Sequence, residues 1–378
     1  MSRISSFILK SIHGNGFLAD LVYGTAQHTW KIKSWFSHTA ANLTKISPEE
    51  LRPYRGLSAA SAVQTAVTNI CNAKCVFCAY PQAVESGALQ RGVMSFEVFK
   101  QAVDEWASLH GENLDLTPTV GDTLVDPGLI QKIEYAVHTA KIKNVMLTTN
   151  AILLNRNNLY QRLVDSGLKS IFISTHGTGR ELYKQVYGVD HYDDVMSGLK
   201  NLFEYNRAQG CPVFIGIRFR NAQKPSEILN SEDFAKFIKP YLGDQVAVNF
   251  TVDYDNWGGA ITEQDMLGHM RLRTLPFKVD APCTGLFGFV VRHDGQVRLC
   301  GCRFKKSDTD DMIVGDLGKE TLKQISEGER TWKIIEGFYS GQRPETCVGC
   351  TMYRPIDRQW LKQRMAKTTS NGQSANGG

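Results

Sequence analysis

The chain has 378 residues, enough for one large domain and a smaller one with a sizeable buried core. Apolar residues make up 42% and charged residues 21%, which argues against a largely disordered protein. The net charge is only +5 and the basic residues form no long run, so nucleic-acid binding is not favoured. No apolar run approaches the roughly 20 residues that span a bilayer, and no convincing export signal is present.

The first 60 residues are expected to form a helical N-terminal extension, residues 1–60. Apolar residues recur there at helical spacing before a glycine-rich turn: Ile4, Phe7, Ile8, Ile12 and then Gly14-Asn15-Gly16. The pattern is compatible with peripheral contact with a membrane surface or a partner. A helix that simply covers the main domain is the favoured interpretation.

The nine cysteines are an odd number and they cluster along the chain. Without an export signal, this distribution indicates reduced thiols that hold metal in the cytoplasm rather than a set of disulfides. A cytoplasmic enzyme is therefore expected.

Six short runs rich in apolar and β-branched residues predict strands, and helical periodicity fills the intervals between them. The runs are 63–69, 113–120, 144–150, 170–175, 213–219 and 246–252. Strands that alternate with helices predict a parallel sheet, because parallel neighbours need long crossovers. Two α/β architectures remain open, a doubly wound sheet and a partly closed barrel. In either one, ligands bind where strands end and loops begin.

Several helix boundaries are marked by individual residues. Ser95 is expected to cap a helix that runs to about His110, and Asp126 precedes a proline suited to a first turn. Gly167 is placed to end the next helix. Ser231 is expected to begin a later helix, which cannot continue normally through the proline at position 240.

After about residue 270 the pattern changes to that of a small α+β module. "GFVVRHDGQVRLC" predicts a hairpin that turns at Asp294-Gly295, followed by helices near 319–327 and 329–339. The polar end of the chain predicts a disordered tail. The predicted domains are therefore 61–270, 271–360 and a tail at 361–378.

Three of the cysteines, Cys71, Cys75 and Cys78, lie in the loop after the first predicted strand. Structural zinc usually takes four ligands, and a four-iron cluster also usually takes four cysteines. Three thiolates would leave one iron open to another ligand, which is a catalytic arrangement. Phe77 is placed to shield such a cluster, and Tyr80 follows the last cysteine.

The Cys-x3-Cys-x2-Cys motif at this position resembles the signature of the radical S-adenosylmethionine (radical SAM) superfamily. The resemblance covers residues 61–265 and implies a partial (β/α)6 TIM-type barrel. It also implies a [4Fe–4S] cluster that binds SAM, and a 5′-deoxyadenosyl radical that takes a hydrogen atom from a small-molecule substrate. A flavodoxin- or ferredoxin-type protein would be the electron donor. The protein itself would position these groups and exclude water.

The resemblance also assigns positions around SAM. Where the superfamily usually has Gly-Gly-Glu-Pro, this chain has Val120-Gly121-Asp122-Thr123, which makes Asp122 the candidate contact to the SAM amino group. Aspartate is one methylene shorter than glutamate and threonine replaces a stiffening proline, so this is a real departure. The alternative role for Asp122 is to cap a turn.

Further cofactor contacts are implied at the ends of the later strands. Asn150 matches a polar position that faces the cofactor, and Ser174 matches a contact to the SAM ribose, for which His176 is a second candidate. Arg218 is expected to pair with the SAM carboxylate. Strand alternation places Arg220 on the same face, so the two arginines are not ranked from the sequence.

The C-terminal module carries a second cysteine set. Cysteine spacing alone allows a four-cysteine zinc site here. Beside a radical SAM motif, however, the layout resembles the auxiliary-cluster domains called SPASM and Twitch, and in particular 2-deoxy-scyllo-inosamine dehydrogenase and related enzymes. This resemblance implies one auxiliary [4Fe–4S] cluster, with the ligands Cys283, Cys300, Cys347 and Cys350. "NWGG" at 256–259 also resembles the broader group.

Two cysteines remain outside both sets. Cys211 precedes the fifth predicted strand and is interpreted as an ordinary buried thiol. Cys302 lies two residues beyond Cys300 and is a candidate to replace it as ligand or to act as a catalytic hydrogen-atom donor.

The expected function is a radical SAM enzyme that acts on a sugar, aminocyclitol or glycoside. Oxidation by a dehydrogenase-like reaction, epimerisation and dehydration all remain open. The alternatives are a peptide- or protein-modifying maturase and, from another class, a non-catalytic module that senses metal or redox state. Fold analogy alone does not choose the substrate.

Overall fold

The structure of the protein is a computed structural model. It describes residues 46–54, 60, 62–176, 178–243, 245–275, 281–301 and 310–363, together with isolated positions before residue 40. The predicted helix at Ile4–Ile12 lies outside the described residues. Of the predicted disordered tail, 361–378, residues 361–363 are helical and Leu361 is buried, so the prediction is wrong there, and the residues from 364 onward lie outside the described residues.

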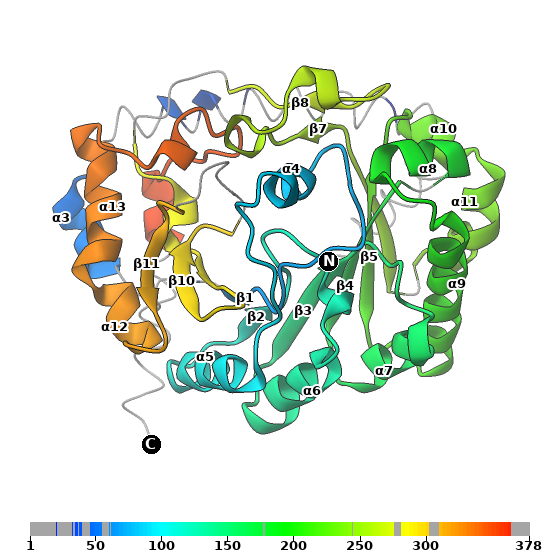
Figure 1. Ribbon diagram of the computed structural model, residues 1–378, viewed down its shortest axis with the longest axis horizontal. Helices are drawn as coiled ribbons and strands as arrows, with labels where there is room; N and C mark the ends of the chain where they lie inside the picture. Colours follow the sequence, from blue (N-terminus) through cyan, green and yellow to red (C-terminus); the bar gives the residue numbers. More distant parts are fainter. Residues whose placement is uncertain are drawn as a thin grey trace.

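Six parallel strands form the centre of the fold, and all six strand predictions are confirmed. They are β1 (Val63–Thr65), β2 (Asn113–Asp115), β3 (Asn144–Thr149), β4 (Ser170–Thr175), β5 (Phe214–Arg220) and β6 (Val246–Thr251). Each strand pairs with the next one in the chain. A doubly wound sheet would reverse its strand order at a switch point, and this sheet does not. The structure is therefore the predicted partial barrel rather than the open alternative (Figure 1).

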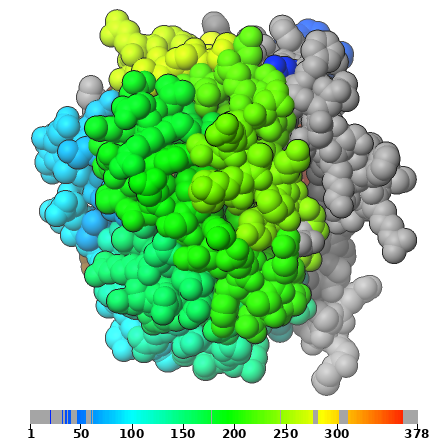
Figure 2. Space-filling view, turned by 90° about the vertical axis from the view of Figure 1, so that its right-hand side faces the viewer, coloured from blue at the N-terminus to red at the C-terminus, as the bar shows by residue number. Residues whose placement is uncertain are grey.

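Helices cover the outer side of these strands (Figure 1). In chain order they are α5 (Phe96–Ser108), α6 (Leu129–Glu134), α7 (Leu159–Asp165), α8 (Arg180–Tyr187), α9 (Tyr192–Ala208), α10 (Pro225–Leu229) and α11 (Glu232–Phe237). The short helix α4 (Tyr80–Glu85) instead lies near the middle of the view in Figure 1. A π-helical turn, Tyr135–Thr139, extends α6. Figure 2 looks onto the outer face, where the middle of the chain, in green, forms a closely packed layer.

The predicted helix boundaries agree with the structure at three of four positions. The Ser95 hydroxyl accepts from the Val98 N–H, and Ser231 caps α11 in the same way. Gly167 follows α7 with a φ of +85°, a conformation that glycine adopts without strain. The difference is at Asp126, because α6 begins only at Leu129.

The Asp126 carboxylate is used in two other ways. It accepts from the Gly128 N–H at 2.8 Å and pairs with Lys132 Nζ at 2.6 Å. Both charged side chains are almost completely buried. The pair therefore joins the start of α6 to its own second turn instead of capping the helix.

The C-terminal strands do not form a layer of their own. The predicted hairpin is present as β9 (Phe289–Val291) and β10 (Gln296–Leu299), and β11 (Ile313–Asp316) pairs with β10. However, β9 also pairs in parallel with β1, so the nine strands form one sheet in the order β11-β10-β9-β1-β2-β3-β4-β5-β6. The C-terminal strands thereby cover an edge of β1 that would otherwise be open.

Three helices lie around this C-terminal edge, α3 (Pro48–Leu51) and the predicted helices α12 (Leu322–Glu327) and α13 (Glu329–Ser340). The short strands β7 (Asp253–Tyr254) and β8 (Arg271–Leu272) pair with each other in a separate two-stranded sheet. The N-terminal α3 packs against α13, since the Tyr339 hydroxyl donates to the Ile46 carbonyl at 2.8 Å.

Side chains alternate along the strands between a buried outer layer and an accessible interior. On β4, Ile171 and Ile173 are fully buried under the helices, whereas Phe172 and Ser174 remain partly exposed. Solvent-accessible side chains in the middle of a sheet indicate an interior that side chains do not fill. The site described below lies at the carboxyl end of these strands.

Candidate active site

The loop between β1 and α4 carries Cys71, Cys75 and Cys78, and α8 fixes its position. The Lys74 N–H donates to the Tyr187 carbonyl at 2.9 Å, and the Val76 N–H donates to the Val186 carbonyl at 3.0 Å. These are carbonyls of the last turn of α8, which have no partner within the helix. The loop therefore serves as the C-terminal cap of α8.

The three thiols are half-buried, and they lie close enough to influence one another's ionisation. Burial raises the pKa of Cys71 to about 12 and that of Cys78 to about 11, and the pKa of Cys75 rises well above its usual value. Each thiol would therefore stay protonated unless a positively charged group bound it. Beside them, Asn72 Nδ2 is buried without a hydrogen-bond partner in the described structure. Three thiols and an unsatisfied donor suit an iron–sulfur cluster with an anionic ligand beside it.

Gly121 and Asp122 support the backbone just before the first cysteine. The Asp122 N–H donates to the Ile70 carbonyl at 2.9 Å. A Cβ atom on Gly121, whose φ is +125°, would come within 3.0 Å of the Asn69 carbonyl carbon. Only glycine allows this approach, so Gly121 brings the two loops together.

The Asp122 carboxylate is fully buried and already holds three donors. It accepts from the Leu124 N–H at 3.0 Å, the Thr149 hydroxyl at 3.0 Å and the Asn150 N–H at 2.6 Å. Burial raises its pKa to about 6 in spite of these bonds. This geometry favours the turn-capping alternative for Asp122 over a direct contact with SAM.

Asn150 extends from the end of β3 to the cysteine loop. Its Nδ2 donates to Asn72 Oδ1 at 2.7 Å, and its Oδ1 accepts from the Ile152 N–H at 3.0 Å. Asn150 therefore orients Asn72 next to Cys71. Asn72 was not among the site residues predicted from the sequence. The one feature that could have indicated it is its position between Cys71 and Cys75.

Of the two candidates on β4, only Ser174 faces the interior. Its hydroxyl lies 3.5 Å from the Tyr187 hydroxyl. His176 is fully buried, with Nδ1 at 2.9 Å from the Thr178 carbonyl and Nε2 accepting from the Ala222 N–H at 3.4 Å. Burial lowers the pKa of His176 to about 4. Both ring nitrogens are engaged, so the geometry gives His176 a structural place.

Aromatic rings line the region above the cysteines. The Phe77 ring centroid lies 5.2 Å from that of Tyr254 and 5.7 Å from that of Tyr187. The Tyr80 hydroxyl donates to the Cys71 carbonyl at 3.3 Å, and its N–H approaches Cys78 Sγ at 3.5 Å. Phe77 and Tyr80 therefore flank the thiols on two sides.

The structure separates the two arginines of β5. Arg220 lies beside the cysteine loop, with its guanidinium carbon 5.7 Å from the Phe77 centroid, and its charge favours the thiolate forms of Cys75 and Cys78. Its Nε is buried and has no hydrogen-bond partner in the described structure. Arg218 lies one pleat deeper, with its guanidinium carbon 4.1 Å from the Phe172 centroid.

Polar groups from three more strands share the interior with Arg218. Gln64 donates to the Thr117 carbonyl at 2.6 Å, and Asp115 accepts from the Thr117 N–H at 2.9 Å. Burial raises the pKa of Asp115, and the charge of Arg218 opposes that rise. Asn249, which pairs with Arg218 in the sheet, is exposed. The interior therefore presents an arginine, a carboxylate and amides.

The second cysteine set lines a small apolar pocket in the C-terminal part of the fold. Cys283, Cys300, Cys347 and Cys350 line it, and apolar side chains complete the wall: Leu286, Met312, Phe338 and Tyr353. A Cβ atom on Gly285 would lie 3.3 Å from Cys300 Sγ and 3.6 Å from Cys283 Sγ, so glycine keeps room for the sulfur atoms. Burial raises the pKa of Cys283 to about 12. Four thiols around one apolar pocket suit a fully coordinated cluster.

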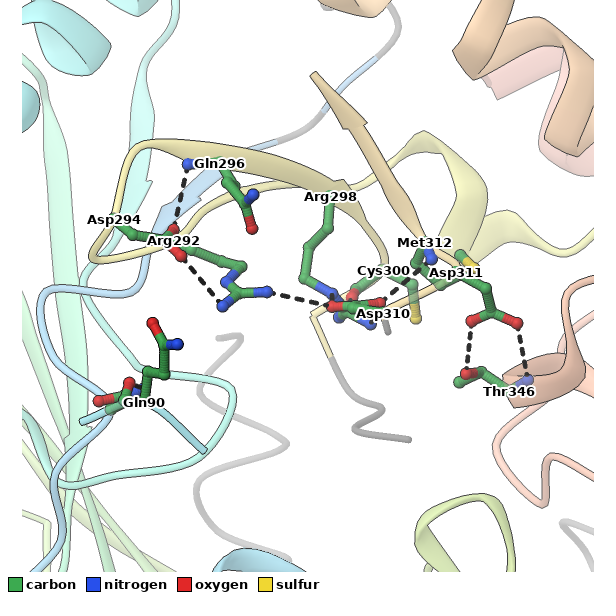
Figure 3. A network of polar contacts seen from close by, with 11 residues as sticks. Gln90, Arg292, Asp294, Gln296, Arg298, Cys300, Asp310, Asp311, Met312 and Thr346 are labelled. Carbon is green, nitrogen blue, oxygen red and sulfur yellow. Dashed lines mark hydrogen bonds and ion pairs between the residues drawn. The ribbon is translucent and has the colours of Figure 1, made fainter. Parts of the chain in front are cut away.

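Charged residues on the β10–β11 connection support this second set (Figure 3). Arg298 is buried and pairs with Asp310 at 2.7 Å, and it also donates to the Cys300 carbonyl. Cys300 has a φ of +64°, which is uncommon for a residue with a side chain. The carboxylate of Asp311 accepts from the hydroxyl of Thr346, the residue before Cys347, at 2.8 Å. Two neighbouring acids therefore each support one cysteine position.

Comparison with known proteins identifies the domain that carries the first site. Residues 65–231 match the family model described as "Radical SAM superfamily". Residues 65–231 belong to the radical SAM superfamily. The radical SAM domain accounts for the three-cysteine loop, and its cofactors are a [4Fe–4S] cluster and SAM.

Individual relatives are distant and match only part of the chain. A GTP 3′,8-cyclase from Pasteurella multocida is 22% identical over 142 residues, and a probable GTP 3′,8-cyclase from Metallosphaera sedula is 30% identical over 144 residues. The chain spans 41% of the length of each. Among solved structures, BtrN in complex with AdoMet and 2-DOIA is similar over 77% of this chain and 92% of that one, with 15% identity and a TM-score of 0.49.

Two further cysteines were considered from the sequence. Cys302 lies in a segment outside the described residues, so its candidate roles stay predictions. Cys211 precedes β5 and is half-buried rather than fully buried. Among the described residues, no helix is long and apolar enough to cross a membrane.

Proposed function

We propose that the radical SAM enzyme acts on a small polar metabolite bound inside the barrel. The observation that carries this proposal is the lining of the barrel interior, where Gln64, Asp115, Ser174, Arg218 and Asn249 offer charges and hydrogen bonds from five strands. A sugar, aminocyclitol or glycoside presents hydroxyl or amino groups that match such a set. Oxidation, epimerisation and dehydration remain the candidate outcomes.

In this proposal Cys71, Cys75 and Cys78 hold the catalytic cluster, and a flavodoxin- or ferredoxin-type protein reduces it. When bound, the cluster and SAM supply the hydrogen-atom abstraction with which the reaction begins. The nearby side chains orient SAM. We assign its carboxylate to Arg220 rather than Arg218, because Arg220 has an unsatisfied Nε beside the cysteine loop.

Arg218 and Asp115 then remain for the substrate. Within the described residues, the contacts of Arg218 are the Phe172 ring and the charges of Arg220 and Asp115. A partly buried guanidinium with donors to spare favours an oxygen-rich ligand. Asp115 is placed to accept from a hydroxyl or amino group of the same molecule, and Phe172 offers an apolar face for a ring.

We assign Cys283, Cys300, Cys347 and Cys350 to one auxiliary [4Fe–4S] cluster, as in Twitch domains. Four thiols leave no iron open, so this cluster would exchange electrons rather than bind substrate. The same four cysteines around zinc would give a structural site, which is the competing assignment.

The first experiment is to quantify iron and sulfide after anaerobic reconstitution and to assay 5′-deoxyadenosine formed from SAM with dithionite. About eight irons per chain with 5′-deoxyadenosine release supports both assignments, at four irons per cluster. About four irons with activity leaves the C-terminal site to zinc. Equimolar zinc without iron or SAM cleavage would mean that the whole proposal is wrong.

The substrate assignment is tested with a matched pair of variants. Arg220→Gln is expected to weaken SAM binding and lower 5′-deoxyadenosine formation in all conditions. Arg218→Gln is expected to leave substrate-free SAM cleavage intact and to abolish its stimulation by substrate. The panel should contain aminocyclitols, sugars, peptides and GTP, the nucleotide named for the curated relatives. Stimulation by peptides alone would favour the maturase alternative.

A further inference from the structure

Two adjacent residues bind the two cysteine loops at equivalent points. The Trp257 Nε1–H donates to the Phe77 carbonyl at 2.9 Å, and Asn256 Nδ2 donates to the Gly349 carbonyl at 3.2 Å. Phe77 immediately precedes Cys78, and Gly349 immediately precedes Cys350. Each carbonyl therefore belongs to the residue before the last cysteine of a Cys-x2-Cys pair.

Residues 255–258 make several hydrogen bonds with the C-terminal cysteine loop and within their own turn. The Asn256 N–H donates to Thr351 Oγ1 at 3.2 Å, and this hydroxyl donates to Asp255 Oδ1 at 2.9 Å. Asn256 Oδ1 in turn accepts from the Gly258 N–H at 3.2 Å, which sets the turn. Residues 255–258 therefore form a hydrogen-bonded frame against the residue that follows Cys350.

The backbone is strained at Trp257, next to Asn256, where one hydrogen bond leads to Phe77 and the other to Gly349. Trp257 has a φ of +49°, and it is followed by Gly258 at +67° and Gly259 at +93°. A left-handed conformation is uncommon for a large side chain and persists only where surrounding contacts over-determine it. Here the strained turn directs the indole to the first loop while the amide of Asn256 reaches the second.

We propose that Asn256 and Trp257 form a bridge that makes the two cysteine loops one cooperative unit. Filling one loop with its cluster fixes that loop's carbonyl, which holds the bridge in place and favours the conformation that the other loop needs. This inference rests on the proposed occupation of both sites. In it, Asn256 and Trp257 are positioning residues that touch neither sulfur nor substrate.

A double-mutant cycle tests the bridge through cluster retention rather than catalysis. The four chains are the wild type, the first-site variant Cys71→Ala/Cys75→Ala/Cys78→Ala, Trp257→Phe, and the combination of the two. The measurement is the rate at which second-site iron is lost to a chelator. Electron paramagnetic resonance identifies the second-site cluster, because its spectrum should not change when SAM is added.

We expect emptying the first site to speed the loss of second-site iron about two- to tenfold, the effect of one net hydrogen bond. Trp257→Phe alone should have a similar effect, and the combination should be no faster than either change alone. If the two effects multiply, the sites are independent and the inference is wrong.

Two further variants keep the result interpretable. Trp106→Phe is the matched control, because Trp106 Nε1 donates to the Asn113 carbonyl at 3.0 Å, within the α5–β2 region. It should leave iron retention unchanged, and an equal effect from both tryptophans would overturn the inference. Asn256→Asp keeps the acceptor for the Gly258 N–H but loses the donor to Gly349, and should speed iron loss in the same way.

Failure of the bridge is distinguishable from failure of the proposed function. A wild-type chain with about eight irons and multiplying effects overturns the bridge alone, with four irons per cluster. A wild-type chain with only four irons has no second cluster. That result overturns the assignment of the auxiliary cluster and, with it, the bridge.

Discussion

The two cysteine sites of this protein differ in number of thiols, in spacing and in surroundings. The first has three thiols within one loop, at the carboxyl end of a parallel sheet and beside polar groups. The second has four thiols from separate segments around an apolar pocket. In the proposed function, three cysteines would leave one iron open for chemistry, whereas four would coordinate a cluster fully.

The comparison shows that cysteines can form a site in two ways, within one loop or between segments that are distant in the chain. Sequence proximity makes the first site a property of one loop, which α8 and the Gly121 loop hold in place. The second site forms only when three separate segments come together. They are the segment before β9, which carries Cys283, the end of β10, which carries Cys300, and the C-terminal loop with Cys347 and Cys350. We expect changes to the first site to remove activity and changes to the second to remove iron and stability.

The largest expected effect is that of Cys75→Ala. Loss of one of three ligands should reduce SAM cleavage to background and iron from about eight to about four per chain, at four irons per cluster. Iron analysis and 5′-deoxyadenosine release measure both. Cys211→Ala is the control and should retain iron and activity, since Cys211 lies in neither set. Residual SAM cleavage in Cys75→Ala would contradict the assignment of the first site.

Cys347→Ala should have the complementary result. Iron should fall to about four per chain, while substrate-free SAM cleavage stays within about twofold of wild type, because the radical SAM cluster keeps its three cysteines. The same two assays measure the outcome. Loss of SAM cleavage together with second-site iron would mean that the comparison drawn between the sites is too simple.

Asp310→Asn should weaken the second site from outside its ligand set. Arg298 is 2% exposed, and Asp310→Asn weakens its charge-assisted hydrogen bonds to residue 310, at a cost of about 1.5–3 kcal/mol in unfolding free energy. Second-site iron should be lost faster, because Arg298 also holds the Cys300 carbonyl. Denaturant unfolding and chelator challenge measure the two effects.

The control for Asp310→Asn is Asp294→Asn, which alters the more exposed end of the same network (Figure 3). A change at such an exposed position is expected to stay within about 0.5 kcal/mol. Equal destabilisation by both variants would show that Arg298 does not depend on Asp310 in particular.

The smallest expected effect is a pH dependence that comes from His176. Its folded pKa of about 4 lies below the unfolded value of about 6.5, so the unfolded chain binds more protons between these values. The stability that neutral His176 contributes is therefore lost as pH falls from about 6.5 to about 4. The neutral ring suits its two partners, because a proton on Nε2 would face the Ala222 N–H.

His176→Asn isolates this contribution. The difference in unfolding free energy between wild type and variant should shrink by up to about 3 kcal/mol across that pH range. Urea denaturation at several pH values measures it. A difference that does not change with pH would place His176 in contact with solvent or ligand instead.

Local features of the fold were predictable from the sequence, and long-range ones were not. The six strands were found because each is a short run rich in apolar and β-branched residues. The caps at Ser95 and Ser231 depend on residues only three positions away. By contrast, the pairing of β9 with β1 joins segments far apart in the chain, for which neither strand carries a local signal.

The site shows the same division. The three-cysteine motif identifies its own loop, but the partners of Asp122 come from β3, so its engagement with Thr149 and Asn150 was not visible. The two arginines of β5 share a face in any strand, and only depth in the barrel separates them. "NWGG" stood out as a pattern, yet its contact with Phe77 depends on the fold.

The parallel pairing of β1 with β9 has a consequence for how the protein is made. During synthesis, β1 and its cysteine loop leave the ribosome long before the hairpin that completes their sheet edge. Until the hairpin arrives, β1 has an unpaired edge, which is a place where other chains can add. Contacts of such long sequence separation also form slowly. Completion of the sheet edge beside the first cysteine loop therefore waits for residues 289–299, which are translated much later than β1.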